Sequence, residues 1–140
     1  MKRYIGTKII HAEPQVEHHA GEPREGYKVV YQDGYTSWSP KDVFEEAYRP
    51  TEGLTFGLAI EALKKGLKVS RAGWNGKGMF LYFVGADSYP VKTEAAKSHF
   101  GSNSMVPYRA YIAMKTVDND VVPWVASQTD VLAEDWSIVE

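Results

Sequence analysis

The chain contains no cysteine and carries little net charge, and each absence excludes a class of chemistry. Without cysteine there is no disulfide, no thiolate zinc site and no cysteine nucleophile. The formal net charge is only -2, so no global basic field draws the protein to nucleic acid. Any anion that binds must therefore be held by local donors.

Long apolar runs are also missing. No run approaches the ~20 residues that span a bilayer. The basic start of the chain lacks the apolar stretch and small-residue cleavage site of a secretory signal. With 44% hydrophobic and 24% charged residues, the composition is that of an ordinary globular protein. We therefore expect a cytoplasmic protein with no membrane partner.

A break in composition near residues 50–53 predicts two parts, 1–50 and 54–140. In the first part we expect a strand at 4–12, a polar loop at 11–24 and a hairpin at 27–38 that turns at Asp33-Gly34. A short helix follows, with Ser39 as the N-cap and Pro40 at the first helical position.

The second part alternates helices and strands. A helix begins at Thr55, presents Phe56, Ala59, Ile60 and Leu63 on one face, and ends at Gly66. Strands are predicted at 67–72, 79–84 and 136–139, with a hairpin at 108–125, a helix capped at 127–130 and a polar loop at 87–105. This order predicts an α+β fold with an antiparallel sheet and short helices.

The glycine-rich turn at 73–78 is the first candidate binding site. Glycines let backbone N–H groups approach a ligand, and successive N–H groups form anion sites. An amide, a tryptophan ring and flanking cations would suit a phosphate-bearing nucleotide. The alternative is a plain Asn-Gly hairpin turn. The candidate residues are Arg71, Trp74, Asn75, Gly76, Lys77 and Met79.

The segment at 123–130 is the second candidate. Its polar residues stand at a predicted helix start, where free N–H groups bind anions and carbonyl edges, and its acid would accept from a purine amine. Helix capping alone is the alternative. The rings of both segments have core packing as their alternative role. The candidates here are Trp124, Ser127, Gln128, Thr129 and Asp130.

No catalytic or metal pattern stands out. His18 and His19 are adjacent and would point apart in a strand, and neither they nor His11 are completed by carboxylates at ligand spacing. No Ser-His-Asp order, paired catalytic carboxylates or nucleophile elbow is present. We expect no metal, no cofactor and no catalytic residue, and hence a protein that is not an enzyme.

Five sequence blocks, at 56–66, 71–81, 111–116, 122–130 and 132–136, resemble in the same order the Thoeris anti-defence protein 2 family of phages. Their clearest motifs are Gly-Trp-Asn-Gly-Lys-Gly from Gly73 and Pro-Trp-Val-Ala-Ser-Gln-Thr-Asp from Pro123. Residues 1–50 resemble a separate small phage module with no assigned activity.

The resemblance implies a sponge that acts in the infected bacterial host. Members of the family are described as oligomers, often tetramers, that sequester glycocyclic ADP-ribose made by Thoeris TIR-domain enzymes and release it intact. Some are also described as binding cyclic dinucleotides at a separate site. In that setting Trp74 or Trp124 would stack the base, Arg71 and Asn75 would take phosphates, and 127–130 would read ribose hydroxyls or the adenine edge. An enzyme that degrades the signal and a phage structural or assembly protein remain alternatives.

Overall fold

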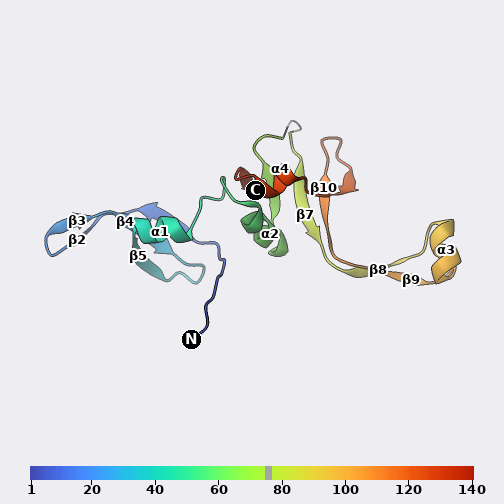
Figure 1. Cartoon of the computed structure of the whole chain (residues 1–140), viewed down its shortest axis with the longest axis horizontal. Helices are drawn as coiled ribbons and strands as arrows, with labels where there is room; N and C mark the ends of the chain where they lie inside the picture. The colour runs from blue at the N-terminus through green and yellow to red at the C-terminus, as the bar shows by residue number, and fades with distance from the viewer. Residues whose placement is uncertain (75–76) are drawn as a thin grey trace. The chain divides into compact units, whose positions relative to one another are not determined.

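The computed structural model describes residues 1–74 and 77–140, and its chain forms two compact units, Met1–Pro50 and Thr51–Glu140 (Figure 1). Each unit has its own sheet, so each is described by itself. Across these described residues, every helix is too short or too polar to cross a bilayer.

The first unit is built on a three-stranded antiparallel sheet in the order β1-β4-β5. A small hairpin, β2-β3, and one helix, α1, complete it. The elements are β1 (His11–Pro14), β2 (Glu17–His19), β3 (Glu22–Arg24), β4 (Gly26–Val30), β5 (Thr36–Pro40) and α1 (Lys41–Ala47).

The predicted hairpin at 27–38 is confirmed as β4 and β5. The strand predicted at 4–12 is largely wrong, because residues 1–10 form no regular element and pairing with β4 begins only at His11. The loop predicted at 11–24 is also wrong, because it contains three short strands. Ala20 and Gly21, at φ 54° and 82°, make the tight turn that lets β2 pair with β3 despite its polar composition.

The core of this unit depends on a close approach of Trp38 to Gly26. A Cβ on Gly26 would lie 2.4 Å from Cζ2 of Trp38, so a glycine is required there. The Trp38 indole N–H donates to the Gln15 carbonyl at 2.8 Å. Tyr27 stacks on Phe44 of α1 at 4.1 Å between ring centroids, which holds the helix to the sheet.

The predicted Ser39 cap of α1 is wrong. Pro40 stands at the N-cap position, and no side chain caps the helix. The reason is that β5 continues to Pro40, which pairs with Gly26, so Ser39 remains in the strand opposite Tyr27. Proline is tolerated at a helix start because its missing N–H would have no helical partner there.

The second unit has a five-stranded antiparallel sheet in the order β11-β10-β7-β6-β12. The predicted α+β class with antiparallel pairing and short helices is confirmed. Its main elements are α2 (Phe56–Lys64), β6 (Lys68–Arg71), β7 (Phe80–Val84), β10 (Tyr111–Lys115), β11 (Val121–Pro123), α4 (Gln128–Leu132) and β12 (Trp136–Val139).

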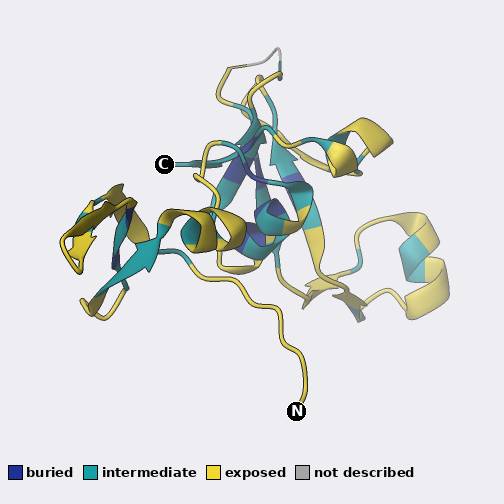
Figure 2. Ribbon diagram, turned by 60° about the vertical axis from the view of Figure 1, so that its left-hand side comes forward, coloured by how far each residue is buried: buried dark blue, intermediate teal, exposed yellow. Residues whose placement is uncertain are grey.

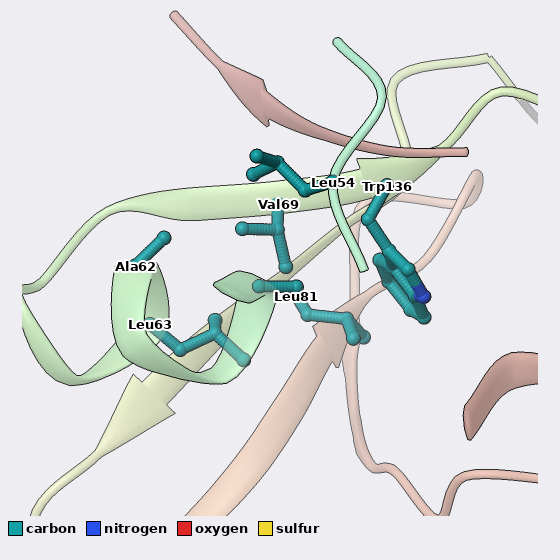
Figure 3. Close-up of a cluster of buried hydrophobic side chains, with 7 residues drawn as sticks. Leu54, Ala62, Leu63, Val69, Leu81 and Trp136 are labelled. Atoms are coloured by element: carbon teal, nitrogen blue, oxygen red, sulfur yellow. The ribbon is translucent and has the colours of Figure 1, made fainter. Parts of the chain in front are cut away.

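Helix α2 covers this sheet and forms the core with it. Thr55 caps the helix as predicted, accepting from the Leu58 N–H at 3.3 Å, and Gly66 ends the turn at φ 86°. Leu63 faces Val69 and Leu81 of the sheet (Figure 3), and the buried residues of the unit gather on α2 and the strands beneath it (Figure 2). The predicted helical face is therefore the packed face, although Phe56 and Ile60 are only partly buried.

The polar loop predicted at 87–105 is wrong. The segment forms an arm of β8 (Asp87–Pro90), α3 (Glu94–Phe100) and β9 (Met105–Tyr108), which continues from β7 and β10 (Figure 1). Prolines in both strands weaken the strand pattern in the sequence, but β8 and β9 still pair over four residues each. Thr93 caps α3 by accepting from the Ala96 N–H at 3.1 Å.

Leu81→Ala should lower the free energy of unfolding of the second unit by about 3 kcal/mol, because it opens a cavity at a fully buried position of the central strand. Leu132→Ala, where the side chain is 75% exposed, is the matched control and should cost less than about 0.5 kcal/mol. Urea unfolding followed by circular dichroism measures both. Equal losses in the two variants would contradict this account of the core.

Candidate functional site

The structure brings the two predicted binding segments together around a cluster of aromatic rings. Trp74, in the glycine-rich segment, lies 5.6 Å from Trp136 between ring centroids, and Trp124 lies 6.0 Å from the same ring. Trp74 and Trp124 are themselves 6.5 Å apart. The two segments, which are far apart in the chain, thus meet in one cluster in which each tryptophan ring neighbours the other two.

The three tryptophans differ in burial, which shows which of them belong to the core and which lie partly at the surface. Trp136 is 0% exposed and belongs to the core. Trp74 and Trp124 are half-buried and pack against that core edge-on. Packing therefore accounts for part of each ring, and the remaining area is available to a flat ligand.

Arg71, predicted to contact phosphates, is paired with two carboxylates of its own chain. Its Nη1 donates to Oδ1 of Asp130 at 2.8 Å, and its Nε donates to Oδ1 of Asp135 at 3.0 Å. These hydrogen bonds, first from Asp135 and then from Asp130, raise the pKa of Arg71 above its ordinary value. One guanidinium and two carboxylates leave the group a net charge of -1.

Asp130 is also part of a complete capping box at the start of α4. Its Oδ2 accepts from the Ser127 N–H at 2.9 Å and from the Ser127 hydroxyl at 2.8 Å, and its own N–H donates to Ser127 Oγ at 3.1 Å. The predicted cap is confirmed, although α4 ends at Leu132 rather than near 135. The carboxylate of Asp130 thus takes the place at this helix start that a bound anion would need.

Two opposing effects act on the ionisation of Asp130. Burial disfavours the charged form, but hydrogen bonds from the Ser127 N–H and hydroxyl and from Arg71 outweigh it. The pKa of Asp130 consequently lies below its ordinary value. The carbonyl of Asp130 also accepts from the Trp136 indole N–H at 2.9 Å, so the residue joins α4 to the aromatic cluster.

The remaining candidate residues that the structure describes differ in exposure. Lys77 is exposed and Met79 is half-buried, while Asn75 and Gly76 lie outside the described residues. Gln128 and Thr129 are exposed, and Thr129 Oγ1 is 2.8 Å from Ser127 Oγ. The side chains of Lys77, Gln128 and Thr129 are therefore at the surface.

Two residues of the site carry no signal in the sequence pattern. Asp135 binds Arg71, and Lys115 donates from Nζ to the Gly78 carbonyl at 3.1 Å, which fixes the far end of the glycine-rich segment. Both act across the sheet on residues distant in sequence. The pairing of β12 with β6 would have indicated Asp135, because this residue precedes Trp136, which lies opposite Arg71.

The three histidines considered as metal ligands, His11, His18 and His19, lie in the first unit, and His99 lies on α3 of the second. His18 and His19 lie on β2, and the ring of His19 is 5.1 Å from that of Trp38 between centroids. Within residues 1–74 and 77–140, no three His, Cys, Asp or Glu side chains are grouped so that they could hold a metal ion.

Comparison with known proteins identifies the second unit. A family model described as the Thoeris anti-defense 2-like domain matches residues 54–139. The chain belongs to this family. A curated protein of Bacillus phage SP01, "Thoeris anti-defense 2", is 45% identical over 89 residues, which cover 61% of this chain and 94% of that protein. The Thoeris anti-defense 2-like region thus contains the aromatic cluster and both candidate segments.

Asp130→Asn should reduce the free energy of unfolding at pH 7 by about 2 kcal/mol, because Arg71 and Ser127 lose a charged acceptor. With its folded-state pKa lowered, Asp130 stabilises the fold above its ordinary pKa of 3.8 and loses this effect as the pH falls below that value. The difference from wild type in urea unfolding should therefore shrink between about pH 5 and pH 2. Exposed Asp118→Asn is the control, and a pH-independent difference for Asp130→Asn would contradict the assignment.

Proposed function

We propose that this chain is a phage anti-defence protein that binds a cyclic nucleotide immune signal and holds it without cleaving it. The proposed signal is glycocyclic ADP-ribose from Thoeris TIR-domain enzymes. The observation that carries the proposal is the meeting of Trp74 and Trp124, both half-buried, within a domain of the Thoeris anti-defense 2-like family. The setting is the cytoplasm of the infected bacterium.

The aromatic rings supply the recognition of a base. Stacking of a base on an aromatic ring contributes about 1 to 3 kcal/mol, and Trp74 and Trp124 are already held in place by Trp136. Rings that are fixed before binding lose little conformational entropy when the ligand arrives. The two tryptophans therefore suit the adenine face of a cyclic ADP-ribose.

The phosphates of the ligand need positive charge that is not already neutralised. Arg71 is bound by two carboxylates, so we assign the phosphates to the other end of the glycine-rich segment. Lys77 is exposed there, and Lys115 reaches the carbonyl of the next residue, Gly78. Two ammonium groups at this end attract a pyrophosphate, and backbone N–H groups of a glycine-rich segment add donors. A contribution of Asn75 stays a prediction.

Holding the ligand intact fits the electrostatics of the site. Asp130, whose pKa is lowered, is a weak base and is ionised at neutral pH, so it cannot donate a proton as a general acid. A sponge needs tight ground-state binding, and a dissociation constant near 10 nM corresponds to about 11 kcal/mol. Burial of the ligand between subunits of a homo-oligomer, a tetramer by our proposal, would supply that affinity. Cyclic dinucleotides would take a separate site.

One experiment separates the sponge from its alternatives. Purified full-length protein is incubated with glycocyclic ADP-ribose and heated, and the supernatant is analysed by chromatography and mass spectrometry. Depletion of free ligand before heating and its intact return afterwards are expected. Fragments would instead indicate an enzyme that degrades the signal. If the protein neither depletes the ligand nor melts at a higher temperature in its presence, a phage structural or assembly role is favoured.

Trp74→Leu and Trp124→Leu should each weaken binding of glycocyclic ADP-ribose by about 10- to 100-fold, because a base loses its stacking surface. Trp74→Phe and Trp124→Phe should recover part of the loss. Calorimetry on the full chain measures the affinities. Trp38→Leu in the first unit is the matched control and should leave affinity unchanged; unchanged affinity in both Leu variants at the cluster would refute this placement.

A further inference from the structure

Beyond the stacking rings, we propose that Asp135 accepts hydrogen bonds from the ribose hydroxyls of the ligand. This proposal rests on the proposed function and names the part of the ligand that one carboxylate reads. It concerns a residue outside the two segments that the sequence singles out.

The two oxygens of Asp135 differ in their hydrogen bonds to the described residues. Oδ1 accepts from Nε of Arg71 at 3.0 Å, while Oδ2 has no hydrogen-bond partner among the described residues. Oδ2 lies 3.7 Å from the point where a Cβ would stand on Gly73, so it faces the start of the glycine-rich segment. The side chain is 35% exposed, against 14% for Asp130, and a ligand can therefore reach it.

Oδ2 of Asp135 is held in a defined position relative to Trp74. The Ala72 N–H donates to the Asp135 carbonyl at 3.1 Å, and the Trp74 N–H donates to the Arg71 carbonyl at 3.3 Å. Arg71 is fixed in turn by Asp130, which belongs to the capping box. Because backbone and side chain are both tied, binding requires little ordering of this acceptor.

The charge around Asp135 selects the kind of group that it binds. Arg71, Asp130 and Asp135 together carry a net charge of -1, which repels a pyrophosphate and attracts hydrogen-bond donors. A carboxylate with a free oxygen is the group that proteins use to bind ribose hydroxyls in dinucleotides. A nucleotide whose base lies on Trp74 carries its ribose directly beside that base. The geometry therefore points to the ribose, and not the phosphates, at this carboxylate.

The test is a double-mutant cycle between the protein and the ligand. Calorimetry on the full chain compares wild type and Asp135→Asn with glycocyclic ADP-ribose and with an analogue in which the free hydroxyl of the adenosine ribose is replaced by hydrogen. We expect Asp135→Asn to weaken binding of the hydroxylated ligand by about 10- to 100-fold, because a charged acceptor is lost. Wild type should lose a similar factor on the analogue, and the variant should then lose little more.

Two further variants keep the result interpretable. Asp118→Asn, the same change at an exposed position in the β10–β11 turn, should bind as wild type does. Gly73→Ala, which places a methyl group 3.7 Å from Oδ2, should weaken binding of the hydroxylated ligand more than that of the analogue. Melting temperatures measured without ligand show whether each variant is folded.

The outcomes distinguish this proposal from the one on which it rests. If wild type binds glycocyclic ADP-ribose and Asp135→Asn binds it equally well, Asp135 does not contact the ligand and the sponge function stands. An equal loss on ligand and analogue would assign Asp135 a structural role only, which also overturns the proposal. If wild type binds no glycocyclic ADP-ribose, both proposals are wrong.

Discussion

The pairing of Arg71 with Asp130 and Asp135 is the interaction on which the rest of the site depends. It joins the end of β6 to the cap of α4 and to the residue before β12, which lie 59 and 64 residues further along the chain. Since a partly buried guanidinium costs free energy unless it is paired, the two carboxylates together stabilise Arg71 in this position. The Trp74 N–H donates to the Arg71 carbonyl and the Trp136 indole donates to the Asp130 carbonyl, so both residues are tied to the residues of this ion pair, whereas the Trp124 N–H donates to Ile112.

Much of the second unit follows from local sequence signals. Thr55 and Gly66 mark the ends of α2, Ser127 marks the start of α4, and these positions are set by capping rules that act over a few residues. The meeting of Trp74 and Trp124 does not follow from such rules, because it depends on how β6, β12 and the rest of the sheet pair.

Errors occur where tertiary contacts override local preference. The arm of β8, α3 and β9 contains prolines and polar residues that favour a loop. Its strands pair nevertheless, because they extend β7 and β10, which already run antiparallel to each other. Ser39 is a good cap that remains in a strand, since β5 continues to Pro40. The ion pairs of Arg71 have no local signal either, because neither carboxylate partner is near it in the chain, and its contact with phosphates stays a prediction.

The junction between β6 and β7 has a consequence for motion. Among the described residues these strands share one registered pair, Val69 with Leu81, whereas β7 and β10 share five. Two strands with so few paired residues separate at a lower free energy than the strand pairs on either side of them. Amide protons in the facing ends of β6 and β7 would then exchange with solvent ahead of those in the rest of the sheet, while both halves of the sheet stay folded.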